Sequence, residues 1–257
     1  MSAMEIDKLK LLMGRPILID KKNNSFIHQP IIRDIVDIGE GEFNKLILPY
    51  VISTDLVFNG VDNEDELIDK FDIFDLFFIK LDNGGTLLDN MFDGNNALNT
   101  LTESLKYFFN TDDVRVLEKR QKIVIDNSYL IDKDEFSNIR SVIQSLVCRK
   151  DIEVEKPPKN MTKRQKDIWN KLQRGRRRTA ERNAIYMQDI INFASFGGRS
   201  FIPFDQIEKM TYFQLQNAYK SVMGIDAYNI GMGYKLSQKF DVKEDIKHWT
   251  DSLKIGK

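Results

Sequence analysis

The chain has 257 residues, of which 42% are hydrophobic and 30% are charged, and its formal net charge is −1 at pH 7. These values are ordinary for a globular protein. The single cysteine, Cys148, excludes an internal disulfide framework, and no apolar run approaches the roughly 18 residues needed to cross a bilayer. The N-terminus lacks the charged segment and long apolar run of a secretory signal, so we expect a cytoplasmic protein.

The first fifty residues alternate between helical and short extended patterns. Apolar residues at helical spacing predict a helix over residues 3–13. Two short apolar runs around a Lys-Lys-Asn-Asn turn predict a small hairpin over residues 16–28. We expect a further helix from Pro30 to Gly39, and another over residues 42–51.

The middle of the chain combines helices with one β element. Residues 71–81 form the most hydrophobic segment, and their aromatic side chains follow helical spacing. Further helices are expected over residues 95–110 and 135–148. Between these two helices the period changes, and it predicts three short strands, at residues 114–117, 122–125 and 129–131.

The C-terminal part begins after a proline pair. Residues 154–160 have the composition of a linker, and Thr162 is a candidate cap for the helix that follows. That helix is expected to reach Phe196, either unbroken or interrupted near Gly175. A second helix should begin after Thr211, run to about Val222 and break at Gly224, before helical character resumes over residues 226–236. The chain should end in a short helix over residues 244–253.

These elements predict a mainly α-helical α+β protein with a helical C-terminal domain. Charge is divided unequally along the chain, because residues 156–182 hold eleven Lys or Arg and only two acids. The remainder therefore carries about ten net negative charges. We expect an acidic α+β domain over residues 1–153, a linker over residues 154–160 and a basic helical domain over residues 161–257.

No catalytic or metal-binding motif is recognisable. The two histidines, His28 and His248, lie far apart, and neither has a second His or Cys at metal-ligand spacing. The carboxylates of residues 62–66 lack the glycine and distal Glu of an EF-hand loop. The glycine pairs belong to no phosphate-binding GxxxxGK-S/T or GxGxxG motif. We therefore expect a protein that is not an enzyme and that holds no cofactor and no metal.

The basic run, residues 161–182, has three interpretations. Its Lys and Arg side chains can lie on the solvated face of a helix, or pair with an acidic protein surface, or neutralise nucleic-acid phosphates. Trp169 and Tyr186 are candidates for stacking on bases, but the run lacks the other signatures of a nucleic-acid-binding fold. Aromatic residues elsewhere could form a partner surface or belong to the core. The candidate partner-binding residues are Trp169, Leu172, Arg174, Arg176, Arg177, Arg178, Tyr186, Tyr212, Tyr219 and Trp249.

Three stretches resemble a known family. Residues 28–40, HQPIIRDIVDIGE, resemble the "P-T-I-x-x-I-x-x-I-G" opening of tail-assembly proteins from phages that infect Gram-positive bacteria, although Ile31 stands where that pattern has Thr. The order of residues 210–219, MTYFQLQNAY, and then Lys247-His-Trp249 is similar to the end of tail-assembly chaperones. The basic segment from Met161 to Arg178 also resembles such proteins.

The resemblance implies a helical morphogenesis factor without an active site. Such a protein binds the tape-measure or tube protein of the tail and holds it soluble until polymerisation. We therefore expect a phage tail-assembly chaperone or structural tail protein, in the host cytoplasm or in the virion. The alternative is a nucleic-acid-binding accessory protein that uses the basic helix over residues 161–182.

Overall fold

The fold is α+β, as predicted, with helix over 58% of the described residues and two small antiparallel sheets among them. It is described by a computed structural model. The structure describes residues 6–61, 63–82, 84–156, 158, 161–198, 201–237, 239 and 245–250. Of the expected helix over residues 244–253, residues 245–250 are described, and only Trp249 and Thr250 are helical there, in a 3-10 turn. Residues 244 and 251–253 lie outside the described residues, as do Pro157, Lys159 and Asn160 of the expected linker.

The N-terminal region begins with a short helix and the predicted hairpin. Helix α1 (Lys8–Leu12) is followed by β1 (Ile17–Asp20) and β2 (Ser25–Ile27), which pair antiparallel with Ile17 opposite Ile27. Helices α2 (Ile32–Ile38) and α3 (Glu40–Val51) then meet at Gly39. Gly39 has a positive φ of 86°, which glycine adopts without strain, so the chain turns at this residue as the sequence predicted.

The aromatic segment is less helical than its spacing suggested. After α4 (Thr54–Val57) and α5 (Glu64–Lys70), only α6 (Ile73–Leu76) is helical within residues 71–81. The Asp72 carboxylate caps α6 by accepting a hydrogen bond from the Phe74 backbone N–H at 2.9 Å. Phe74, Phe77 and Phe78 are all buried. These aromatic side chains therefore belong to the core, which was one of the two interpretations left open by the sequence.

The predicted β element is a three-stranded meander. Strands β3 (Val114–Leu117), β4 (Lys122–Ile125) and β5 (Tyr129–Ile131) pair antiparallel in chain order. The 3-10 turn η2 (Glu118–Arg120) joins the first two strands. Ile123 and Ile125 are buried while Val124 between them is less so, as expected for a sheet with one face on the core.

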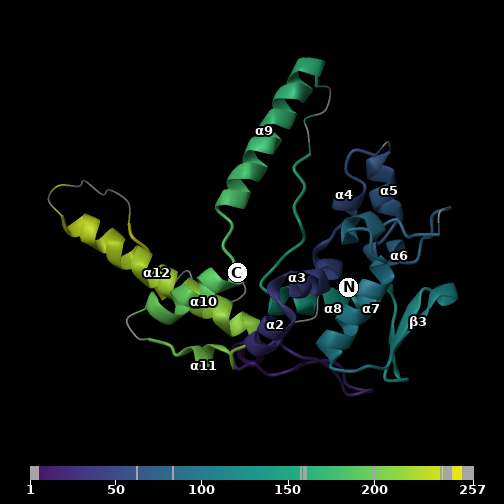
Figure 1. The fold of residues 1–257 in the computed structure, drawn as a ribbon, viewed down its shortest axis with the longest axis horizontal. Helices are drawn as coiled ribbons and strands as arrows, with labels where there is room; N and C mark the ends of the chain where they lie inside the picture. Colours follow the sequence, from purple (N-terminus) through teal and green to yellow (C-terminus); the bar gives the residue numbers. More distant parts are fainter. Residues whose placement is uncertain are drawn as a thin grey trace.

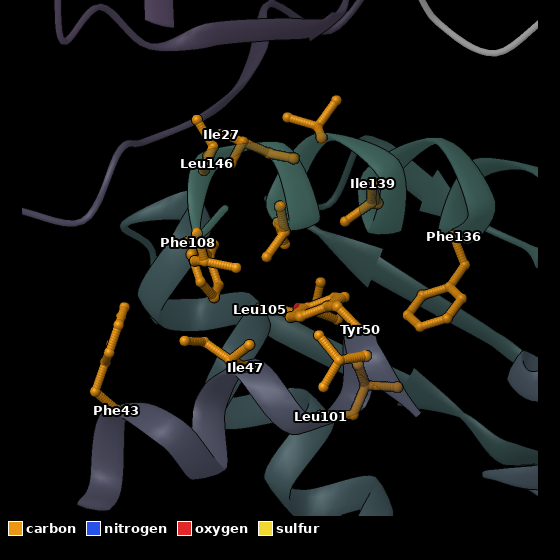
Figure 2. Close-up of a cluster of buried hydrophobic side chains, with 14 of the residues drawn as sticks. Ile27, Phe43, Ile47, Tyr50, Leu101, Leu105, Phe108, Phe136, Ile139 and Leu146 are labelled. Carbon is orange, nitrogen blue, oxygen red and sulfur yellow. The ribbon is translucent and has the colours of Figure 1, made fainter. Parts of the chain in front are cut away.

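The core lies where α3, α7 (Ala97–Phe109) and α8 (Lys133–Leu146) pack together (Figure 2). Another 3-10 turn, η1 (Asp89–Phe92), precedes α7. The Tyr50 ring contacts the rings of Phe108 and Phe136, with centroids 5.7 and 5.9 Å away. The buried Ser104 hydroxyl donates to the Leu46 carbonyl at 2.6 Å and lies 3.0 Å from the Tyr50 hydroxyl. The hydroxyls of Ser104 and Tyr50 therefore have partners, as burial requires.

Two predictions about the C-terminal helices were wrong in detail. The chain forms α9 (Lys163–Arg182), α10 (Met187–Phe196), α11 (Phe204–Ile207) and α12 (Tyr212–Leu236). The break after α9 falls at residues 183–186 and not near Gly175, because the Asp189 carboxylate accepts from the Tyr186 backbone N–H and starts a new helix. Helix α12 also continues through Gly224, because a helical glycine costs only about 1 kcal/mol.

The two halves of the chain contact each other at the start of α12. The Tyr212 backbone N–H donates to the Pro30 carbonyl at 2.8 Å, and the Ile32 N–H donates to the Met210 carbonyl at 2.9 Å. The Tyr212 ring packs on Phe43 of α3. Figure 1 shows α12 extending away from this contact, with α10 beside it. The division into domains at residues 153 and 161 remains a prediction.

Candidate partner-binding surface

Helix α9 is the most exposed long element among the described residues. Figure 1 shows it projecting from the rest of the molecule, with the segment that follows α8 running beside it. The Thr162 hydroxyl accepts from the Gln165 backbone N–H, and the Gln165 side chain accepts from the Thr162 N–H. This capping box explains where the helix begins. None of its twenty residues is buried, and they include nine basic and two acidic side chains.

The inner face of α9 covers the extended segment 152–155. Trp169 is partly buried there and lines a groove of about 700 Å³ together with Ile152 and Val154. The Gln173 amide donates to the Glu155 carboxylate at 2.6 Å, and Arg176 also hydrogen-bonds to that carboxylate. The hydrogen bond from Gln173 and the charge of Arg176 lower the pKa of Glu155. Glu155 is therefore the acidic side chain that attaches α9 to its own chain.

Segment 152–156 is itself held by the body of the protein. The Ile152 backbone N–H donates to the Val51 carbonyl at 2.8 Å. The Lys156 ammonium lies 2.7 Å from the Glu64 carboxylate and 3.0 Å from that of Asp55. The hydrogen bond from Lys156 lowers the pKa of Glu64, and hydrogen bonds to Glu64 and Asp55 raise the pKa of Lys156. Segment 152–156, which includes the first residues of the expected linker, is therefore anchored at both ends.

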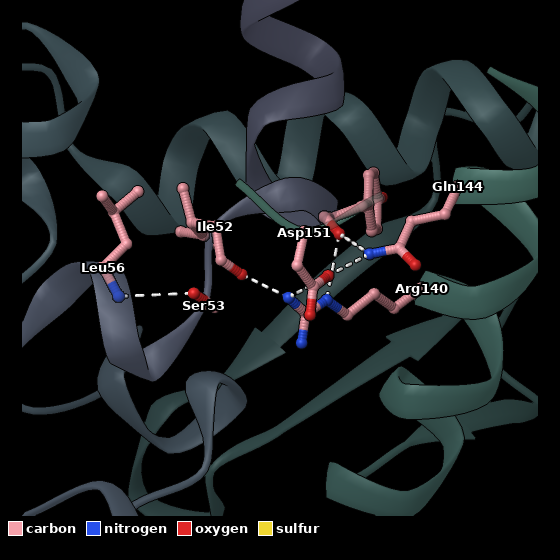
Figure 3. Close-up of polar contacts among 7 residues, drawn as sticks. Ile52, Ser53, Leu56, Arg140, Gln144 and Asp151 are labelled. Atoms are coloured by element: carbon pink, nitrogen blue, oxygen red, sulfur yellow. Dashed lines mark hydrogen bonds and ion pairs between the residues drawn. The ribbon is translucent and has the colours of Figure 1, made fainter. Parts of the chain in front are cut away.

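Another cluster fixes the chain where it leaves α8 (Figure 3). The Arg140 guanidinium donates to the Tyr50 carbonyl at 3.0 Å and to the Ile52 carbonyl, and it lies 2.8 Å from the Asp151 carboxylate. The Gln144 amide donates to the same Tyr50 carbonyl and to Asp151. This cluster ties the end of α3 to α8 and to the segment that supports α9. The role of this cluster is structural, because the donor groups of Arg140 and Gln144 are used in hydrogen bonds to main-chain carbonyls.

The face of α9 that lies about 100° around the helix from Trp169 carries an apolar stripe. Ile168, Leu172, Gly175 and Thr179, which we call the outer stripe, follow one another at intervals of four, three and four residues and so lie on one side of the helix. The side chains of Ile168 and Leu172 are 50% and 55% exposed. In the part of the chain that the structure describes, the shallow groove along this stripe is lined by α9 and its C-cap residue Asn183.

The structure does not gather all the predicted site residues on one surface. Arg174, Arg176, Arg177 and Arg178 are exposed on α9, and Tyr186 is exposed between α9 and α10. By contrast, Tyr212 is buried against Phe43 and lies in the core, and Tyr219 packs on Phe193 of α10. Trp249 is partly buried beside His248, which in turn packs on Tyr228 of α12. Tyr219 and Trp249 therefore pack within the C-terminal region, whereas Tyr212 joins that region to α3.

An aromatic patch was missed by the sequence reasoning. Phe196, Phe201 and Phe204 are each about half exposed or more, and the Phe196 ring lies 5.3 and 5.8 Å from the other two. We call these residues the phenylalanine patch. Its signal in the sequence is three Phe residues within nine positions around Gly197-Gly198. Contiguous exposed apolar side chains of this kind mark interaction surfaces.

The described residues show neither a metal-binding cluster nor a helix that could cross a membrane. They contain no group of three or more His, Cys, Asp or Glu side chains placed to hold a metal ion. None of the helices formed by these residues is both long enough and apolar enough to pass through a bilayer.

The comparisons with known proteins point to a phage context. Residues 178–254 match the family model described as the YomV second domain, a family associated with phages of Gram-positive bacteria. The match begins at Arg178, near the end of α9, and spans α10, α11 and α12. No curated protein and no solved structure matched the chain. The C-terminal region is thus similar to a phage-associated family, while most of α9 lies outside the matched segment.

Proposed function

We propose that this protein is a non-enzymatic phage tail-assembly chaperone or structural tail protein that acts through protein–protein contacts. The observation that carries the proposal is α9, a twenty-residue helix with no buried residue and an apolar stripe on its outer face. Most of the stability of a helix in a protein comes from packing of its amphipathic face, and α9 packs against segment 152–155 without burying any of its own residues. A partner protein that covers the outer stripe would supply the missing contacts.

Two further observations support a role in assembly. The phenylalanine patch provides another exposed apolar surface, on the C-terminal region that matches a phage-associated family. A chaperone for an unpolymerised subunit needs such apolar surfaces beside charged rims. The partner that we propose is the tape-measure or tube protein of the tail, met in the host cytoplasm or in the assembling particle.

The proposal is tested by co-expression with the tape-measure protein and, separately, the tube protein of the same phage. We expect the partner to remain in the soluble fraction and to co-purify with this chain, and to sediment when it is expressed alone. Triple substitution of the phenylalanine patch with Ser should reduce the recovered partner. If both tail proteins partition identically with and without this chain, the assembly role is wrong.

Nucleic-acid binding is the second candidate, and one observation favours it. Arg174 and the consecutive residues Arg176–Arg178 are all exposed on α9, where they can reach phosphates. The triple variant Arg176→Ala, Arg177→Ala, Arg178→Ala should then abolish a salt-sensitive mobility shift with DNA or RNA. A wild-type chain that gives no shift at low salt would eliminate this candidate.

A further inference from the structure

We propose that the outer stripe of α9 docks an acidic amphipathic helix of a partner protein. This inference rests on the proposed function, because it names the chemistry of the surface that an assembly partner would present. It concerns the residues Ile168, Leu172, Gly175 and Thr179 and the basic side chains on either side of them.

The spacing of the outer stripe suits a second helix. Intervals of four, three and four residues average about 3.7, close to the 3.6 residues per turn of an α-helix, so the stripe runs along one side of α9 and a second helix can pack along its length. Ile168 and Leu172 provide two exposed apolar side chains for the contact. Gly175 follows one turn later, and a Cβ added there would meet no atom within 4 Å. A partner backbone can therefore approach closely at this point.

The charges beside the stripe select an acidic partner. At 100° per residue, Arg164, Lys171 and Arg178 all fall along one edge of the stripe, and Arg176 lies along the other. Glutamate or aspartate side chains flanking the apolar face of a partner helix would meet these cations, as charges at the edges of coiled coils do. The helix has nine basic and two acidic residues, a formal charge of +7.

The same charge disfavours other occupants within this protein. A second copy of α9 would bring two helices of charge +7 together, and like charges across an interface oppose association. The acidic side chain that this chain places on α9 is Glu155, and it binds the inner face through Gln173 and Arg176. Gln173 lies about 100° around α9 from Leu172, so among the described residues this contact leaves the outer stripe uncovered.

The arrangement of the arginines favours a protein over a nucleic acid. Arg176, Arg177 and Arg178 are consecutive in the sequence, but successive helical residues point 100° apart, so these side chains project to three sides of α9. A phosphate backbone would contact cations and gain nothing from Ile168 and Leu172. An amphipathic helix uses both the apolar residues and the flanking charges.

The test uses the full-length chain and three fluorescent probes in an anisotropy titration. The first probe is a synthetic three-heptad peptide with Leu and Ile along one face and Glu on both flanks. The second has Lys in place of every Glu, and the third is a short duplex DNA. We expect the acidic peptide to bind, the basic peptide to bind at least about tenfold more weakly, and the affinity for the acidic peptide to fall with added salt.

Matched variants separate the apolar from the electrostatic contribution. The double variant Ile168→Ser, Leu172→Ser should weaken the acidic peptide by about tenfold or more. Arg164→Gln with Lys171→Gln should weaken it severalfold and flatten its salt dependence. Lys163→Gln with Arg174→Gln removes the same charge from the other side of α9 and should leave the affinity close to that of the parent. All these residues are exposed or half-exposed, and circular dichroism verifies that each variant keeps its helix.

Several results would overturn the inference. It is wrong if the acidic peptide does not bind, if the Ile168→Ser, Leu172→Ser variant binds it as well as the parent does, or if duplex DNA binds more tightly and is weakened equally by both pairs of charge removals. The co-expression experiment keeps this result separate from the proposed function. A chain that fails to bind the peptide but still holds a tail protein in solution refutes the docking site and retains the assembly role. A chain that binds the acidic peptide but does not change the solubility of either tail protein supports the docking site and refutes the assembly role.

Discussion

Helices α8 and α9 follow one another in the chain and begin in the same way, but they are held by different forces. Each has an N-terminal side chain that accepts a backbone hydrogen bond, Asp132 from Glu135 in α8 and Thr162 from Gln165 in α9. Beyond that point they diverge. Five residues of α8 are buried, and none of α9 is. The cap determines where a helix starts, whereas burial determines how strongly the rest of the protein stabilises it.

This comparison separates global from local stability. Helix α8 lies in the core against α3, with Phe136 between the rings of Tyr50 and Phe74. Helix α9 is attached through side chains at the edge of segment 152–155. We therefore expect α8 to unfold with the whole protein, and α9 to open on its own with a much smaller free energy.

The largest expected effect comes from truncating a side chain in each helix. Phe136→Ala should lower the free energy of unfolding by about 3–5 kcal/mol, because it removes a fully buried ring and leaves a cavity. Leu172→Ala, in α9, should change it by less than about 0.5 kcal/mol. Urea denaturation of the two variants measures both values. Equal losses would mean that α9 belongs to the cooperative core.

A smaller difference is expected for two arginines. Arg140→Met leaves the carbonyls of Tyr50 and Ile52 without their guanidinium donor and should cost about 1–3 kcal/mol. Arg174→Met, on the exposed surface of α9, should be close to neutral in the same denaturation experiment. A neutral Arg140→Met would show that Gln144, which also donates to Tyr50, suffices to satisfy that carbonyl.

Local chemistry explains how much of the fold was predictable from the sequence. The three strands of the meander and the hairpin over residues 16–28 were predicted closely, because each strand is a short apolar run between turn residues. The α12 break expected at Gly224 was wrong, since a glycine penalises a helix modestly and the helix continues through it. The start of α10 was not predicted, because the Asp189 carboxylate caps a new helix at a point where the previous helix was expected to continue.

The candidate surface was less predictable than the fold. The basic composition of α9 and its apolar positions are visible in the sequence. Which of these side chains are covered depends on the tertiary contact of α9 with segment 152–155, and the sequence pattern of α9 does not reveal that contact. The same limit applies to Tyr212, an aromatic residue at the start of an amphipathic helix that lies against Phe43 in the core. Burial of such residues is decided by elements far away in the chain, and periodicity carries no information about them.

Removing the two caps sharpens the comparison further. Asp132→Ala should lower the global free energy of unfolding by about 1 kcal/mol, because α8 unfolds with the core. Thr162→Ala removes an equivalent hydrogen bond, but its cost should appear only as faster hydrogen exchange at the first turn of α9. Denaturation combined with residue-resolved hydrogen exchange measures the two effects. A global loss from Thr162→Ala would contradict the independence of α9.

The smallest effect is the pH dependence of the contact at Glu155. Its pKa is lowered in the folded protein, so the contact contributes stability above the ordinary glutamate pKa and loses it as the pH falls through the lowered value. Trp169 lies in the groove beside this contact and reports it by fluorescence in a Trp249→Phe background. We expect its emission to move to longer wavelength on acidification below about pH 4, while the core remains folded. In Glu155→Gln, the emission at neutral pH should already resemble that of the parent at low pH, and it should change little on acidification. If the parent and Glu155→Gln give the same pH profile, other carboxylates hold α9. The next residue to mutate is then Glu64, which pairs with Lys156.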